Sequence, residues 1–338
     1  MTPLTFRECL NRALDRILAE DDRAYILGED ILDPYGGAFK VTTGLSTRYP
    51  GRVRSTPVSE AGIIGVSIGM ALAGLHPIVE IMFADFLTLG FDQLFNHATK
   101  FPYMYDGRAP CPVVVRTPTG AGRGYGPTHS QCPEKYFLGM PGLTVVAANH
   151  HTDPYPLIKQ LQNDRGPSLL IEHKGLYAQP MWTGERLGEA GWQWLDFKFG
   201  EFPARALSLV EPRRCHMVVV AYGEFARRLE EVVMELALED EIFCLLVCPT
   251  RLNPSSMEPL WQLARPIGRL VFAEEGAQGW SWGTEWAYRA QVECGSSLEA
   301  APVCLASRAD IIPCNIWRES ETILTTERLT TRLRELAR

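Results

Sequence analysis

The chain has 338 residues, more than one hydrophobic core usually serves, and its 46% apolar and 22% charged residues are typical of a globular protein of two domains. A formal net charge of −7, without any cluster of lysine and arginine, argues against nucleic-acid binding. No stretch approaches the roughly 18 consecutive apolar residues of a membrane-spanning helix, so we expect no membrane segment.

The first half of the chain alternates short apolar runs with helical patterns, which is typical of an α/β fold with a mostly parallel sheet. A capping box from Thr5 to Glu8 opens an amphipathic helix over Phe6–Glu20. The expected strands are Ala24–Leu27, Val53–Ser55, His76–Glu80, Pro112–Arg116, Leu143–Ala147 and Ser168–Glu172. The other expected helices are Glu60–Gly74, Phe83–Phe101 and Asp153–Asn163.

A second α/β pattern follows residues 182–214, a stretch rich in Trp, Gly and Pro that we interpret as an ordered linker. The expected strands after it are Met217–Tyr222, Glu241–Val247, Leu270–Ala273 and Pro302–Ala306. The expected helices are Glu224–Glu239, Ser281–Gln291 and Glu327–Leu336. The sequence therefore predicts two α/β domains, over residues 1–181 and 215–338.

The cysteines point to a reducing environment. None of the nine forms a C-x-x-C pair, and Cys244 and Cys248 bracket an apolar run that predicts core thiols. We therefore expect a cytoplasmic protein.

Residues 56–62, Thr-Pro-Val-Ser-Glu-Ala-Gly, place Glu60 at the start of a helix whose next face is almost entirely small. Gly62, Gly65, Gly69 and Ala73 follow at steps of three and four. Each helical glycine costs about 0.5–1 kcal/mol relative to alanine, so this face suggests a close approach to the helix backbone. The alternative is a glutamate favoured by the helix dipole, with glycines that serve helix packing.

A glycine-rich segment from Gly120 carries His129 after an apolar strand. Such a loop brings backbone amides and one imidazole close to a ligand, although a solvent-facing histidine is the alternative. The adjacent His150 and His151 are interpreted as loop residues that point in different directions, and not as metal ligands. Because no activated nucleophile stands out, an acid, a histidine and aromatic side chains around glycine-rich backbone favour a borrowed cofactor.

Read together, these segments resemble the β subunit of thiamine-diphosphate-dependent 2-oxo-acid dehydrogenases of the pyruvate and branched-chain type, in the transketolase superfamily. The resemblance implies a doubly wound pyrimidine-binding domain followed by a smaller, doubly wound transketolase C-terminal domain. The matching stretches are Leu27–Asp30, Tyr35–Leu45, Thr56–Gly62, Ala73–Pro77, Phe91–Gln93, Thr128–Gln131, Pro141–Leu143 and Glu274–Gly276.

The resemblance also implies roles for individual residues. Glu60 matches the glutamate that hydrogen-bonds the pyrimidine N1′ of the cofactor, and Phe86 matches the aromatic ring stacked near that pyrimidine. His129 matches the active-site histidine, and Glu29 an acid in the polar tunnel between paired active sites. Asp164 matches a residue near a structural monovalent cation, although only the aspartate of that site is recognisable.

The G-D-G…N motif that binds diphosphate and magnesium in the superfamily does not occur in this sequence. Relatives of this kind receive it from an α-type subunit, so the resemblance implies such a partner, usually in an α2β2 assembly, with magnesium held by that partner. The chain departs from the family pattern at Pro133 and over Ala309–Trp317. The second departure falls in the domain that, by the resemblance, helps dock a lipoyl acyltransferase, so it bears on membership of a multienzyme complex and not on the cofactor chemistry.

The leading functional hypothesis is therefore decarboxylation of a small 2-oxo acid by a heteromeric enzyme, with Glu60 activating the cofactor and His129 orienting the substrate. One alternative is a two-subunit, transketolase-like carboligase of a specialised pathway. Another is a non-catalytic relic that only binds a partner.

Overall fold

The computed structural model describes residues 3–182 and 184–338, which form two compact units. Unit 1 contains the residues up to Thr119 together with Tyr136–Ala148 and Thr152–Met181. Unit 2 contains Gly120–Lys135, Asn149–His151 and the residues from Trp182 onward. Two short segments of the first half thus belong to unit 2, which no local sequence pattern had indicated.

Unit 1 is built on a six-stranded parallel sheet in the order β2-β1-β3-β4-β6-β5. The strands are β1 (Ala24–Gly28), β2 (Val53–Ser55), β3 (His76–Glu80), β4 (Val114–Thr119), β5 (Thr144–Ala147) and β6 (Ser168–His173). After β1 the chain first builds β2 on one side of it and then β3 on the other. Ligands of open α/β sheets bind at the carboxyl ends of the strands beside such a switch point.

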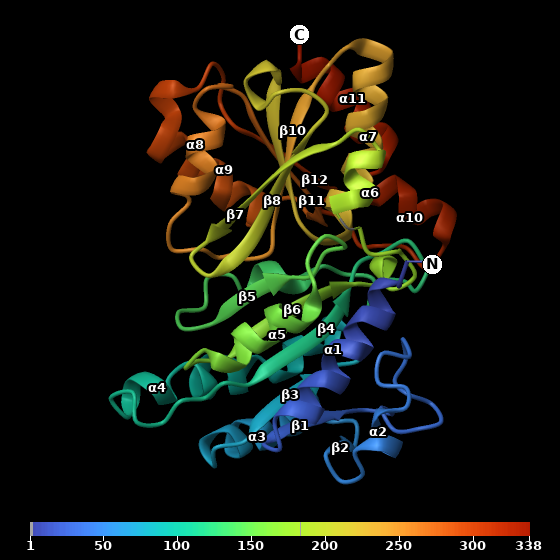
Figure 1. Cartoon of the computed structure of the whole chain (residues 1–338), viewed down its shortest axis with the longest axis vertical. Helices are drawn as coiled ribbons and strands as arrows, with labels where there is room; N and C mark the ends of the chain where they lie inside the picture. Colours follow the sequence, from blue (N-terminus) through green and yellow to red (C-terminus); the bar gives the residue numbers. More distant parts are fainter. Residues whose placement is uncertain (1–2, 183) are drawn as a thin grey trace. The chain divides into compact units, whose positions relative to one another are not determined.

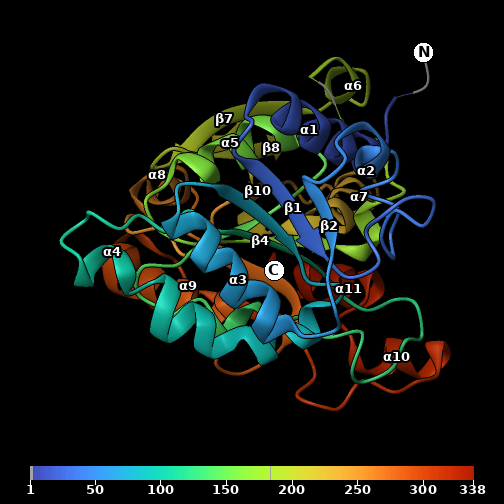
Figure 2. The same ribbon diagram turned by 90° about the horizontal axis from the view of Figure 1, so that it is seen from below.

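Helices cover both faces of this sheet, as Figures 1 and 2 show. Helices α1 (Phe6–Glu20) and α5 (Pro154–Asn163) lie side by side on one face, and α3 (Glu60–Leu72) lies on the other. Helix α1 starts at the expected capping box and buries one apolar stripe, which includes Leu10, Leu14 and Ile17. The short helix α2 (Leu45–Arg48) belongs to the loop between β1 and β2.

The region expected as one helix over Phe83–Phe101 is instead broken into three short pieces. A 3₁₀ helix spans Ala84–Gly90, a π-helical segment spans Gln93–Ala98, and α4 is Phe101–Met104. Gly90 lies where the 3₁₀ helix passes α3 so closely that an added Cβ would collide with Ile64. This packing against α3 overrides the helical propensity of the segment.

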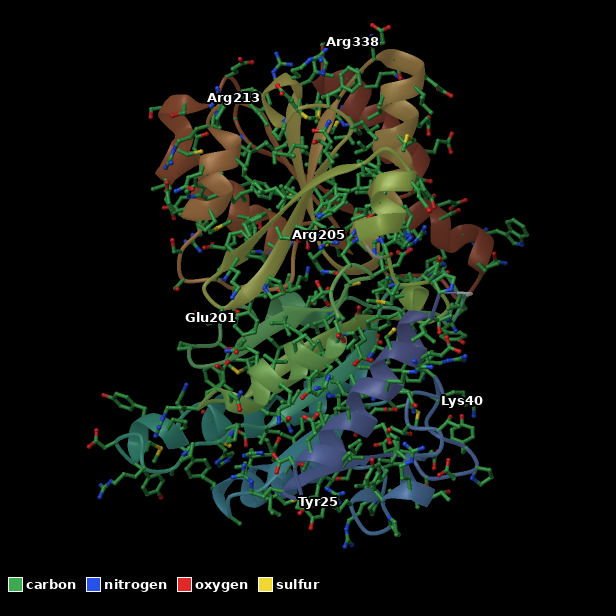
Figure 3. All side chains as sticks on the ribbon, viewed as in Figure 1. Tyr25, Lys40, Glu201, Arg205, Arg213 and Arg338 are labelled. Carbon is green, nitrogen blue, oxygen red and sulfur yellow. The ribbon has the colours of Figure 1, made fainter. Side chains whose placement is uncertain are left out.

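Unit 2 contains a second six-stranded sheet, in the order β12-β11-β9-β10-β8-β7. Four strands are parallel neighbours: β9 (Met217–Ala221), β10 (Cys244–Pro249), β11 (Leu270–Ala277) and β12 (Val303–Ser307). The expected linker at 182–214 is wrong in its central part, because β7 (Gln193–Phe199) and β8 (Phe202–Ser208) form an antiparallel hairpin that extends this sheet. Figure 3 labels Glu201 in the hairpin turn and Arg205 on β8.

The helices of unit 2 also lie on both faces of their sheet (Figure 1). Helices α7 (Gly223–Asp240) and α11 (Thr326–Leu336) pack together on one face, and α9 (Trp282–Cys294) covers the other. The remaining helices of this unit are α6 (Gly184–Glu189), α8 (Glu258–Ala264) and α10 (Ile316–Thr322). The core between the sheet and α7 includes the buried thiols of Cys244 and Cys248, as expected. Among the described helices, none is long and apolar enough to cross a membrane.

Candidate active site

Three glutamates gather at the carboxyl ends of the strands in unit 1. Glu29 directly follows β1, Glu80 ends the neighbouring strand β3, and Glu60 begins α3. Burial, followed by the charge of Glu60 and then by those of Asp30 and Glu80, raises the pKa of Glu29. The carboxylates are therefore close enough to influence one another, and they line the switch point of the sheet.

The carboxylate of Glu60 has no partner among the described residues. The residue is 5% exposed, and its side chain forms no hydrogen bond or ion pair within the described parts of the chain. It is the first residue of α3, where the helix dipole favours a negative charge. Because a buried carboxylate is costly unless it is hydrogen-bonded, this side chain is well suited to accept a bond from a ligand or to share a proton with it.

The small-residue face of α3 is open in the described chain. A Cβ added at Gly69 would meet no atom within 4 Å, and one added at Gly65 would meet only Gln93 Cγ, at 3.8 Å. At Gly65 and Gly69, therefore, no described residue supplies the close approach that the sequence suggested for this face.

Gly37 explains part of the glycine pattern in the loop between β1 and α2. Its φ of +81° favours glycine, and an added Cβ would lie 3.0 Å from Glu80 Oε1. The loop backbone is thus pressed against one of the clustered acids. Thr42 anchors the same loop by donating a hydrogen bond to the carbonyl of Ile31 at 2.8 Å.

Phe86 lies half-buried on the 3₁₀ helix that packs against α3. Its ring meets that of Phe83 edge-on, with the centroids 6.1 Å apart. Glu29, Glu60 and Phe86, which were predicted to bind the cofactor, therefore lie on neighbouring elements of unit 1.

Glu80 also belongs to a buried ion cluster in the same sheet. Arg116 of β4 donates hydrogen bonds to Glu80 and, at 2.8 and 2.6 Å, to the two carboxylate oxygens of Glu172 on β6. The Tyr177 hydroxyl donates to Glu172 Oε2 at 2.7 Å. Burial raises the pKa of Glu80, against the opposing charge of Arg116. This cluster is not among the predicted features, although an arginine inside an apolar strand is a signal for a buried ionic partner.

Gly65 to Gly69 match the G-x-S-x-G pattern of a nucleophile elbow, but the structure excludes that role for Ser67. Ser67 lies inside α3, is fully buried, and donates its hydroxyl to the carbonyl of Ile63 at 2.8 Å. An elbow requires a sharp turn between a strand and a helix, so Ser67 has a structural role in the helix.

His129 lies on the glycine-rich segment 120–131, which belongs to unit 2. Its imidazole is half-buried, and Nδ1 is 3.0 Å from Thr128 Oγ1. Two carboxylates fix the segment: Glu275 accepts from the Ala121 N–H at 2.6 Å, and Glu319 accepts from the Gly124 N–H at 3.0 Å. A joint role of His129 and Glu60, which lie in different units, stays a prediction.

The stretch that departs from the family pattern lies beside this segment. An added Cβ at Gly126, where φ is +80°, would lie 2.8 Å from Cys314 Sγ, and one at Gly124 would lie 3.3 Å from Ile316 Cβ. Residues 309–317 therefore help shape the backbone that carries His129.

Glu274 on β11 gives a prediction for stability. Burial raises its pKa to about 7, although the Gly283 N–H donates to it at 2.7 Å. Between an unfolded pKa near 4.5 and this value, the native state retains a proton that the unfolded chain releases, so this group lowers stability as pH rises.

The Glu274→Gln variant keeps an acceptor for Gly283 but does not titrate. Between pH 5 and pH 8 the free energy of unfolding of this variant should therefore fall less than that of the parent chain, and the two losses should differ by on the order of 1–3 kcal/mol. Urea unfolding at both pH values measures this difference, and equal losses in the two proteins would show that Glu274 is not the responsible group.

Asp164 caps the end of α5, and its Oδ2 lies 3.5 Å from Thr144 Oγ1. It belongs to neither of the two groups of His, Cys, Asp and Glu side chains whose spacing suits a metal ion among the described residues. The monovalent cation expected near Asp164 stays a prediction.

The interpretation of His150 and His151 as residues that point apart is wrong. Their ring centroids are 4.0 Å apart, and Nε2 of each contacts the carboxylate of Glu230 on α7, at 3.0 and 2.7 Å. Alternation of neighbouring side chains applies to extended strands, whereas these residues lie in a turn closed by Asn149 Oδ1, which accepts from the His151 N–H at 2.9 Å. Burial, and then the neighbouring His150, lowers the pKa of His151 to about 4.

Two α/β units, with a buried acid at a helix start beside the switch point of a parallel sheet, define a class of proteins with a transketolase-type domain. Residues 2–180 match the family described as the pyrimidine-binding domain of transketolase. Over the whole chain, the solved structure of a split-gene transketolase, described as an inactive beta4 tetramer, has the same fold, with a TM-score of 0.75, 19% identity and 98% of both chains covered.

Curated relatives define the family more closely. The beta subunit of acetoin:2,6-dichlorophenolindophenol oxidoreductase from Cupriavidus necator is 32% identical over 88% of this chain and 86% of that protein. The human mitochondrial pyruvate dehydrogenase E1 beta subunit is 31% identical over 91% and 83%, respectively. The beta subunit of 2-oxoisovalerate dehydrogenase from Pseudomonas aeruginosa is 32% identical over 89% and 86%.

The chain belongs to this family, as a β subunit of the thiamine-diphosphate-dependent 2-oxo-acid dehydrogenase type. Unit 1 fits the pyrimidine side of such a cofactor, because Glu60 offers a buried carboxylate without a protein partner and Phe86 lies on the adjoining element.

Proposed function

We propose that this chain supplies the pyrimidine side of a thiamine diphosphate site in an enzyme that decarboxylates a small 2-oxo acid. The observation that carries the proposal is the carboxylate of Glu60, which is buried at the start of α3 and has no partner among the described residues. The relatives that are subunits of pyruvate and 2-oxoisovalerate dehydrogenases support the substrate class.

When bound, thiamine diphosphate supplies a nucleophilic carbon that attacks the ketone of the substrate. Glu60 holds the proton that is shared with the pyrimidine ring, and the ring of Phe86 limits access of water to it. Glu29, whose pKa is raised by burial and by Glu60, takes up or releases a proton beside Glu60. His129 orients the substrate by hydrogen bonding.

An α-type subunit completes the site in this proposal, in an α2β2 assembly, and it holds the magnesium ion and the diphosphate. A group of exposed apolar side chains on and around α3 and the broken helical region that follows β3 supports a protein partner. They are Val58, Val66, Leu72, Leu89, Phe95, Tyr103 and Met104.

A lipoyl acyltransferase is the proposed acceptor of the acyl group. The free thiols of the described cysteines agree with the cytoplasmic location that we propose.

Reconstitution tests the proposed function. The chain is mixed with the α-type subunit encoded beside it, thiamine diphosphate and magnesium, and release of carbon dioxide is measured from pyruvate and branched-chain 2-oxo acids. Release that depends on both subunits is the expected result. An assembled pair that binds thiamine diphosphate but releases carbon dioxide from no 2-oxo acid would contradict the proposed reaction.

A second candidate is cleavage of acetoin, which the relative from Cupriavidus necator favours by its name. Acetoin is a hydroxyketone, so its cleavage yields an aldehyde and no carbon dioxide. The same reconstituted pair, given either acetoin or a 2-oxo acid with 2,6-dichlorophenolindophenol as the oxidant of the remaining acyl-forming fragment, separates the two reactions by the substrate that reduces the dye and by release of aldehyde or carbon dioxide. Aldehyde acceptors test the carboligase alternative in the same way.

The open face of α3 gives a prediction about assembly. Gly69→Ala should stabilise the isolated chain by about 0.5–1 kcal/mol, because alanine is the better helix former and the added Cβ meets no atom within 4 Å. If a partner packs on this face, the same variant should weaken assembly. Urea unfolding of the isolated chain and sedimentation of the mixture measure the two effects, and assembly at unchanged affinity would place the partner elsewhere.

A further inference from the structure

A second cluster of side chains able to bind a ligand lies in unit 2, and it includes none of the residues that carry the proposed reaction. It consists of His150 and His151 on a turn and Glu230 on α7. His150 and Glu230 are 0% and 4% exposed, and the side chain of His151 is 1% exposed. One potential ligand atom from each residue lies within 4.8 Å of those of the other two.

The distances suit a small metal ion. The Nε2 atoms of the two histidines lie 3.0 and 2.7 Å from Glu230 Oε1. In a tetrahedral zinc site with bonds of about 2.0–2.2 Å, neighbouring ligand atoms are about 3.3 Å apart. Each imidazole nitrogen therefore needs to move away from the carboxylate oxygen by only a few tenths of an ångström to make room for such an ion.

Hydrogen bonding alone does not use the full bonding capacity of these rings. Nδ1 of His150 and Nδ1 of His151 are buried and have no hydrogen-bond partner within the described chain. A neutral imidazole has one N–H group and one lone pair, so a bond to Glu230 leaves the second nitrogen of each ring unsatisfied. A metal ion bound at Nε2 takes the lone pair of each ring in place of the hydrogen bond to Glu230, with the N–H group of each ring then at Nδ1, and the carboxylate neutralises part of the charge of the ion.

The surroundings are compatible with a cation. Arg205 on β8 (labelled in Figure 3) is the nearby positive charge that acts on His151, but its guanidinium is paired with Asp196 at 2.6 and 3.0 Å. The ring of Trp182 meets both imidazoles edge-on, with centroids 5.8 and 6.2 Å away, and it adds an apolar wall. The thiol of Cys248 on β10 is buried within electrostatic reach of Glu230.

We propose that His150, His151 and Glu230 form a binding site for a divalent transition-metal ion of the zinc class. Two imidazole nitrogens and one carboxylate select such an ion over magnesium or calcium, which prefer oxygen ligands. The site joins the turn at 149–151 to α7, so the bound ion stabilises unit 2 and takes no part in the reaction proposed above.

Titration calorimetry of the full, untagged chain with zinc chloride tests the site. A Cys314→Ser background removes the exposed thiol as a competing ligand. One equivalent should bind, and the melting temperature should rise with zinc and not with magnesium. His151→Gln and Glu230→Gln should each weaken zinc binding by about 100-fold or more.

His97→Gln is the matched control, since His97 is half-exposed and lies 3.5 Å from the single carboxylate of Asp92. It should leave zinc binding unchanged. Binding of one equivalent that survives both cluster substitutions would place the metal elsewhere and overturn the proposal.

Should both cluster variants fail to fold, the parent chain decides the question with cobalt(II) chloride. The expected result is a visible absorption spectrum of a four- or five-coordinate cobalt ion, which one equivalent of zinc removes. A parent chain that gives neither this spectrum nor heat with zinc would overturn the proposal.

Discussion

Replacing Glu60 by glutamine is expected to lower kcat of the reconstituted enzyme by about 100-fold or more, while the chain remains folded. Glutamine has nearly the same shape but cannot share a proton with the pyrimidine ring, and positioned acid–base groups typically contribute about 10²–10⁴-fold. Single-turnover release of carbon dioxide measures the loss. Calorimetry should show that thiamine diphosphate still binds, because its diphosphate is held by the partner in the proposed assembly.

Glu201→Gln is a control for the substitution itself, since Glu201 lies in the hairpin turn and its side chain is 73% exposed. Its activity should equal that of the parent enzyme. An undiminished rate in the Glu60→Gln enzyme would reject the assigned role of Glu60, whatever the fold.

Much of the fold and part of the site could be predicted because the signals are local. The capping box at Thr5 set the start of α1, and Ser59-Glu60 set the start of α3. Continuous apolar runs such as Met217–Ala221 mark buried parallel strands. Glu29 and Glu60 were assigned to the cofactor site by the family resemblance, and in the structure they follow β1 and begin α3, respectively, at the carboxyl ends of the strands.

The missed features have two causes: an irregular local pattern in the hairpin, and contacts between residues that are distant in sequence. The hairpin of β7 and β8 lacks a clean two-residue period of hydrophobicity, because both faces of β7 carry apolar and polar residues. A usable signal was nevertheless present, since Asp196 and Lys198 alternate with phenylalanines before a Gly-Glu turn. The pairing of His150 and His151 with Glu230 spans 79–80 residues, and no local pattern reports it. Arg116 and Glu172 likewise meet only because β4 and β6 are neighbours.

The second large effect concerns this ion cluster. Arg116→Met should lower the free energy of unfolding by about 3–5 kcal/mol at pH 7, because it leaves Glu80 and Glu172 buried without their counter-charge. Urea unfolding measures the loss. Arg16→Met, which removes a partner of Glu20 in an exposed pair with an N–O distance of 2.7 Å, should have little effect.

The pH dependence distinguishes this cause from simple loss of packing. Burial already raises the pKa of Glu80 and Arg116 opposes that shift, so removing the guanidinium raises the pKa further. The native variant then retains protons that the unfolded chain releases above an ordinary glutamate pKa, and its stability falls as pH rises. The deficit should therefore be smaller at pH 5 than at pH 8, and Glu80→Gln with Glu172→Gln in the same chain should recover most of it. If the loss in free energy of unfolding is equal at both pH values, then lost packing is its cause and the buried charges do not contribute to it.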